Sequence, residues 1–113
     1  MPSKRQHPYS PYAAEAAQLL GARIRLARRE RRWSQDELAA RAGITPRTLS
    51  KIEHGELSVG LGAVFEAAAL VGVPLFFTER SRLSADLDRV EAKGALLPRP
   101  PRVRRDVEVK DEF

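Results

Sequence analysis

The chain has 113 residues, which is enough for one small domain with tails, and a net charge of +5, which suits a polyanionic partner such as nucleic acid. It contains no cysteine, so disulfides and thiolate metal sites are excluded. Neither a long apolar run nor the apolar core of a secretory signal is present, and we therefore expect a cytoplasmic protein without a membrane partner.

The two ends of the chain have the composition of segments that do not fold alone. Residues 1–12 contain three prolines and two tyrosines, and residues 94–113 contain three prolines followed by mixed charge. Such segments bury too little apolar surface to offset the entropy lost on ordering. We expect a flexible N-terminal arm over 1–12 and a disordered tail over 94–113.

Helical spacing of apolar residues begins directly after the arm. Steps of four and three define one face, formed by Ala13, Ala17, Leu20, Ile24 and Ala27. This pattern predicts a first helix over roughly residues 13–31. Six arginines lie between residues 23 and 32. They form either a solvated face or a surface that attracts the DNA backbone regardless of base sequence.

A second, short helix is marked at both ends. Ser34 and Glu37 have the spacing of a capping box, in which each side chain binds a backbone amide near the other residue. Gly43 suits the left-handed residue that ends a helix. These signals predict a helix over 35–42.

A third helix is predicted over 46–53, because Thr45 suits the N-cap and Pro46 the first turn. Two short helices that meet at a tight turn are what reading of the DNA major groove requires, when the second begins with small polar and basic side chains. The stretch from residue 35 to residue 55 is therefore the candidate for function.

Two further helices complete the pattern. Apolar spacing predicts a fourth helix over 61–71 and a last one over about 81–93. Between them, residues 75–78 form a short apolar run that is either a strand or the start of a helix.

The candidate stretch resembles the helix-turn-helix of the Cro and phage-repressor class, the Xre-type regulators. The likeness rests on Gln35-x-Glu37-Leu38-Ala39-x-x-Ala42-Gly43-Ile44-Thr45-x-x-Thr48-Leu49-Ser50-x-Ile52-Glu53-x-Gly55 and ends in Val71-Gly72-Val73-Pro74. It implies an all-α, lambda-repressor-like five-helix DNA-binding domain over 13–78. It also implies a repressor that reads double-stranded DNA at a palindromic operator and is neither an enzyme nor in need of a cofactor or metal.

The resemblance assigns roles to individual positions. The expected base-reading side chains are Arg47, Thr48 and Lys51. The side chains expected to contact the DNA backbone are Ser34, Gln35, Thr45, Ser50 and His54. Arg28 and Glu53 are expected to form a structural pair. Arg47 is the strongest base reader, because a guanidinium pairs in two places with guanine O6 and N7. Pro46 departs from the polar reader often found in the family and removes one base contact.

Specific affinity in this class usually requires two half-sites and hence a homodimer. The segment 79–93 is the expected dimerisation helix, together with a short strand over 75–78. The side chains expected at the dimer surface are Leu75, Phe76, Phe77, Leu83, Leu87 and Val90. The alternative is that the stripe on this helix packs on its own domain.

A second resemblance concerns the arm, the loop and the tail. Tyr9-Ser10-Pro11, Ser58-Val59-Gly60-Leu61-Gly62 and Asp111-Glu112-Phe113 are similar to segments of the HipB-type antitoxins. That family implies a HipA-like kinase toxin as partner and repression of the shared operon. The alternatives are a stand-alone repressor and an adaptor that uses the same fold to bind protein.

Overall fold

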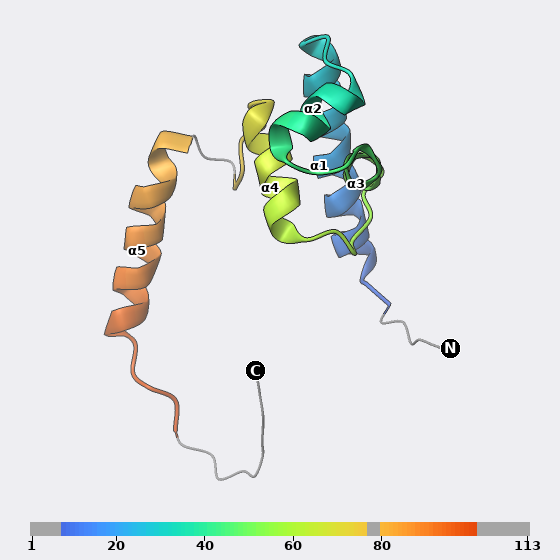
Figure 1. Ribbon diagram of the computed structural model, residues 1–113. Coiled ribbons are helices and arrows are strands. Elements are labelled where there is room, and N and C mark those ends of the chain that lie inside the picture. Colours follow the sequence, from blue (N-terminus) through green and yellow to red (C-terminus); the bar gives the residue numbers. More distant parts are fainter. Residues whose placement is uncertain (1–7, 77–79, 102–113) are drawn as a thin grey trace. The chain divides into compact units, whose positions relative to one another are not determined.

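A computed structural model of the protein describes residues 8–76 and 80–101. Five α-helices follow one another in these ranges (Figure 1): α1 (Pro11–Glu30), α2 (Gln35–Ala42), α3 (Pro46–Glu53), α4 (Leu61–Leu70) and α5 (Leu83–Leu96). A short 3-10 helix, η1 (Arg80–Arg82), precedes α5. Within the described ranges only Leu75 is assigned to a β-bridge, so the predicted all-α class is confirmed.

The chain divides into two units, residues 1–80 and residues 81–113. The first unit holds α1 to α4, and the second holds α5. No helix in the described ranges is long and apolar enough to cross a membrane.

The first helix begins two residues earlier than predicted. Ser10 is its N-cap, and the Ser10 hydroxyl accepts a hydrogen bond of 3.1 Å from the Ala13 amide. Pro11 follows in the first turn, where a residue without an N–H costs no hydrogen bond. Pro11 and Tyr12 therefore belong to α1 and not to the arm. The predicted end of the arm at residue 12 was wrong.

The helix-turn-helix has the predicted limits. Ser34 Oγ accepts from the Glu37 amide at 3.1 Å, and Glu37 Oε1 accepts from the Ser34 amide at 2.9 Å, which completes the capping box. Gly43 ends α2 with φ of +71°, the left-handed conformation that favours glycine. Thr45 Oγ1 accepts from the Thr48 amide at 3.1 Å and starts α3.

The later elements differ from the prediction by a few residues. Helix α4 ends one residue early, and α5 runs to Leu96, so the expected tail boundary at residue 94 was wrong. Leu75 is the bridge residue, and Phe76 lies in a turn with φ of +57°. The rest of the 75–78 run, including Phe77, lies outside the described residues.

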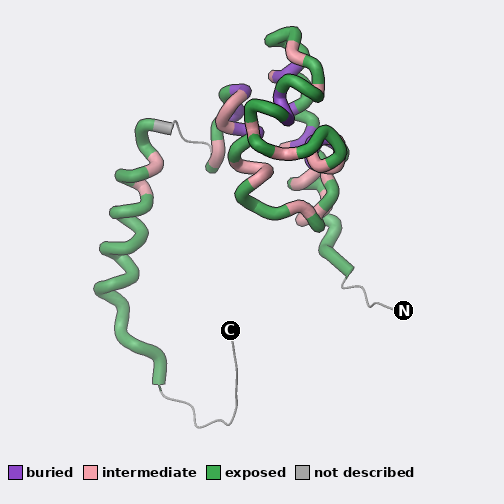
Figure 2. Tube along the Cα trace, in the orientation of Figure 1, coloured by how far each residue is buried: buried purple, intermediate pink, exposed green. Residues whose placement is uncertain are grey.

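The core of the first unit lies among its four helices (Figure 2). Its buried apolar residues are Ile24, Leu38, Ala39, Leu49, Ile52, Ala67, Ala68, Val71 and Val73. Helix α3 packs on both α1 and α2, and α2 also packs on α4. This arrangement holds α3 by two neighbours while one side of it faces outward.

Two glycines allow α1 and the end of α3 to approach closely. A Cβ at Gly21 would lie 2.3 Å from the Ile52 carbonyl oxygen, inside the contact limit of any atom pair. Gly55, just after α3, has φ of +79°, and a Cβ there would lie 2.8 Å from the Cα of Gln18. A side chain at either position would push the two helices apart.

We predict that Gly21→Ala lowers the free energy of unfolding by about 1–3 kcal/mol, because the added methyl group overlaps backbone that cannot move freely. Gly62→Ala is the matched control, since a Cβ at Gly62 has no heavy atom within 4 Å. It should leave stability unchanged or raise it by up to about 1 kcal/mol. Urea denaturation followed by circular dichroism measures both, and equal effects would contradict the close approach of α1 and α3.

Candidate nucleic-acid interface

Helix α3 presents two different sides. Leu49 and Ile52 are buried and fix the inner side against α1 and α2. On the outer side Arg47 is exposed, while Thr48 and Lys51 are half-buried. The turn before α3 is held by the Ile44 amide, which donates to the Ala39 carbonyl at 3.0 Å. The three expected base readers thus share one outward side of a firmly packed helix.

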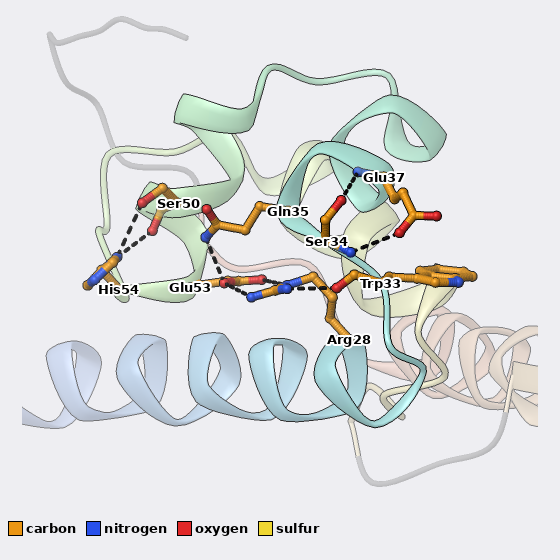
Figure 3. Close-up of polar contacts among 8 residues, drawn as sticks. All are labelled: Arg28, Trp33, Ser34, Gln35, Glu37, Ser50, Glu53 and His54. Atoms are coloured by element: carbon orange, nitrogen blue, oxygen red, sulfur yellow. Dashed lines mark hydrogen bonds and ion pairs between the residues drawn. The ribbon is translucent and has the colours of Figure 1, made fainter.

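A buried polar network fixes the other end of α3 (Figure 3). Arg28 Nε donates to Glu53 Oε2 at 2.7 Å, and Arg28 Nη2 donates to Glu53 Oε1 at 3.1 Å. Gln35 Nε2 donates to the same Oε1 at 3.0 Å. Arg28 also donates through Nη1 to the Trp33 carbonyl at 2.8 Å. The network therefore joins α1, the turn after it, the first residue of α2 and the last residue of α3.

Burial makes this network important for the position of α3. The side chain of Glu53 is 1% exposed and that of Arg28 is 9% exposed. A charge so far from water is tolerated only with an opposite charge and hydrogen bonds around it. The two further partners of the Arg28–Glu53 pair, Gln35 and the Trp33 carbonyl, belong to different elements, so rotation of α3 would leave a buried charge without its partners.

Trp33 supports the turn between α1 and α2. Its ring packs against the core, with the guanidinium carbon of Arg41 4.3 Å and that of Arg31 5.5 Å from the ring centroid. Arg31 Nε donates to the Val71 carbonyl at 3.3 Å, which links the end of α1 to the end of α4. Arg31 and Arg41 are exposed like Arg25 and Arg29, but they also make these contacts within the fold.

Four of the five expected backbone-contacting residues, Ser34, Gln35, Thr45 and His54, lie at helix ends, and Ser50 lies within α3. The hydroxyls of Ser34 and Thr45 are exposed but already serve as helix caps. Thr45 Oγ1 also donates to Thr48 Oγ1 at 3.0 Å. His54 caps the end of α3, and its Nδ1 donates to the Ser50 carbonyl at 2.7 Å (Figure 3).

Three structural features escaped the sequence analysis. Gly21 is the first, although an isolated glycine inside a helical pattern is itself a signal of close packing. The stacking of Arg41 on Trp33 is the second, and nothing in the spacing indicates it. The third is the bond from Gln35 to Glu53, which occupies one amide hydrogen of a side chain expected on phosphate.

The described residues contain no group of three or more His, Asp or Glu side chains that could hold a metal ion. The outer side of α3 carries two cations, Arg47 and Lys51, and the helix starts carry the hydroxyls of Ser34 and Thr45, with the acidic Asp36 and Glu37 in the first turn of α2. The cations and hydroxyls suit an anionic, hydrogen-bonding partner.

Comparison with known proteins agrees with this geometry. Residues 24–77 match the family model described as Helix-turn-helix, and this range contains α2, the turn at Gly43 and α3. The chain is also 32% identical over 72 residues to an uncharacterized HTH-type transcriptional regulator, y4dL, of Sinorhizobium fredii (strain NBRC 101917 / NGR234). That match covers 64% of this chain and 37% of the relative, so the chain spans little more than a third of that protein. No solved structure gives a significant match.

We predict that Arg28→Met lowers the free energy of unfolding by about 3–5 kcal/mol, because it leaves the buried Glu53 carboxylate without its counter-charge. The double variant Arg28→Met/Glu53→Leu should lose much less, since neither charge then remains buried. Arg89→Met is the control, because the Arg89–Asp86 pair is exposed, and it should cost under about 1 kcal/mol. Equal losses in Arg28→Met and Arg89→Met would contradict a structural role for the pair.

Proposed function

We propose that the protein is a sequence-specific DNA-binding transcriptional repressor that places α3 in the major groove. The observation that carries the proposal is the pairing of a fixed inner side of α3 with an outer side formed by Arg47, Thr48 and Lys51. None of these three side chains forms an ion pair within the described residues. The match to a helix-turn-helix family model and the name of the relative, an HTH-type transcriptional regulator, support the same interpretation.

Each of the three side chains makes a different contact in the major groove. Arg47, at the exposed start of α3, pairs with O6 and N7 of a guanine. Thr48 contacts a thymine methyl or a phosphate, and Lys51 reaches a base or the backbone. Pro46 has no polar side chain and no N–H, so specificity depends on Arg47 more than in relatives with a polar residue there.

Contacts to the DNA backbone fix the register of α3. Helix N-termini offer unpaired amides to phosphate, and the exposed polar residues at the starts of α2 and α3 lie beside such amides. The residues proposed for these contacts are Ser34, Gln35, Thr45, Ser50 and His54. Exposed arginines of α1 add attraction that does not depend on sequence.

The proposal includes a homodimer on a palindromic operator, because one α3 covers a single half-site. The apolar residues Leu83, Leu87 and Val90 lie on α5, none of whose residues is buried. They remain a candidate self-association surface together with Leu75 and Phe76.

We further propose that the repressor is the antitoxin of a HipBA-like pair, which binds a kinase toxin and represses the shared operon. Support comes from the resemblance of the arm, of the loop before α4 and of the tail to HipB-type antitoxins. The second candidate is a stand-alone repressor without a toxin, and we assign no catalytic activity in either case.

We predict that the protein prefers the DNA upstream of its own gene to scrambled DNA, and that Arg47→Ala removes most of this preference. One bidentate arginine–guanine contact contributes about 1–3 kcal/mol of discrimination, or roughly 5- to 150-fold in the ratio of dissociation constants. Fluorescence anisotropy over a salt series measures the ratio. Arg99→Ala, which removes the same charge from an exposed residue after α5, should retain it. Equal binding of both DNAs by the unaltered protein would sink the proposal.

We predict that co-expression of the protein relieves the growth arrest caused by a kinase-like product of the neighbouring gene. The double variant Arg47→Ala/Lys51→Ala should relieve it equally, because these residues face DNA and not the toxin in the proposal. Growth assays and co-purification measure both effects. The antitoxin proposal would be contradicted by a neighbouring product that is not kinase-like, or by one that the protein neither binds nor neutralises. Either result would favour the stand-alone repressor.

A further inference from the structure

Helix α1 carries a second apolar strip besides its core face. Tyr12, Leu19 and Leu26 are 83%, 53% and 59% exposed, and they recur at steps of seven along the helix. Ala22, also exposed, lies between the two leucines. We call these four residues the α1 seam. A repeat of seven is the spacing by which one helix packs along another.

The α1 seam faces away from α3. Leu19 and Leu26 each precede by two residues a position that contacts α3, namely Gly21 and Arg28. Two residues correspond to about 200° around an α-helix, so the seam lies on nearly the opposite side of α1. Occupation of the seam therefore leaves the outer side of α3 open.

One pair of charges beside the α1 seam complements a second copy, whereas Arg23, on the other flank, lies next to the axis and near its own counterpart. Glu15 and Arg29 are exposed, stand two heptads apart on the same flank of the seam, and form no ion pair within the described residues. When two such helices pack antiparallel about a two-fold axis at Ala22, residues on matching flanks meet. Leu19 of one copy then faces Leu26 of the other, and Glu15 faces Arg29. Each contact occurs twice, as an isologous interface requires.

We propose that two copies of this chain associate through the α1 seam, packed antiparallel with Ala22 at the axis and Glu15 paired with Arg29 across the interface. The small side chain of Ala22 lets the helices approach at the axis. The inference names the surface through which the proposed repressor would form a dimer. It rests on the proposed function only in the expectation that this dimer binds DNA. It assigns self-association to α1, a surface separate from the α5 stripe.

A groove continues the α1 seam and widens the apolar surface. It has a volume of about 640 Å³ and is lined by Tyr12 and Leu19 of α1, Phe65 of α4 and Phe76 after α4, among others. Phe65 and Phe76 meet edge to face with their ring centroids 6.0 Å apart. The interface therefore extends beyond one pair of helices, and Phe76 lies at its edge.

Sedimentation velocity of the full chain without DNA, over a range of concentrations, tests the inference. The unaltered protein should form a dimer, and Glu15→Arg and Arg29→Glu should each raise the dissociation constant at least about tenfold, because like charges then face each other twice. The charge-swapped Glu15→Arg/Arg29→Glu should restore it to within about threefold. Glu91→Arg, at an exposed position of α5, is the charge-matched control and should change nothing.

Other outcomes overturn the inference. These are a monomer at all concentrations, failure of the double variant to recover, or a dimer that resists Glu15→Arg and is lost in Leu87→Ser on α5. The proposed function is tested separately by anisotropy on upstream and scrambled DNA with the same samples. A dimer that binds both DNAs equally would contradict the proposed repressor function but not the dimer through the α1 seam. A monomer that prefers the upstream DNA would contradict only the dimer through the α1 seam.

Discussion

The orientation of α3 depends on one buried ion pair. Arg28 on α1 and Glu53 at the end of α3 meet at 2.7 Å almost without solvent, and Gln35 and the Trp33 carbonyl complete their hydrogen bonds. Such a pair contributes less to stability than to geometry, because an apolar replacement of both residues would serve stability as well. Its effect is to define a single orientation of α3 relative to α1 and α2. A reader of base edges needs that orientation, since its side chains must meet fixed donors and acceptors.

Local signals in the sequence predicted the helix-turn-helix closely, because its ends are set by residues that act within one turn. The capping box at Ser34, the left-handed Gly43 and the Thr45 cap each determine a boundary without help from distant parts of the chain. The start of α1 was missed because proline was read as a mark of the arm, although Pro11 suits a first turn behind Ser10. The close approach at Gly21 was missed because it depends on α3, which is far away in sequence.

Helix α1 takes part both in the proposed reading of DNA by α3 and in the proposed dimer. One side of it holds α3 through Gly21 and Arg28, and the side facing away carries the exposed seam with Leu19 and Leu26. A two-fold axis on that outer side would give two outward-facing copies of α3 in fixed relation. In the proposed function, the identity of the bases read depends on Arg47 and its neighbours on α3.

The central claim is that α3 enters the major groove with Arg47 on a guanine. Dimethyl sulfate methylates guanine N7 in that groove, so a methylation-protection experiment on the DNA upstream of the gene tests the claim directly. The account predicts protected guanines in two clusters about one helical turn (10–10.5 base pairs) or a multiple of it apart, with the protection lost in Arg47→Ala. Binding of that DNA with every guanine N7 still reactive would contradict it.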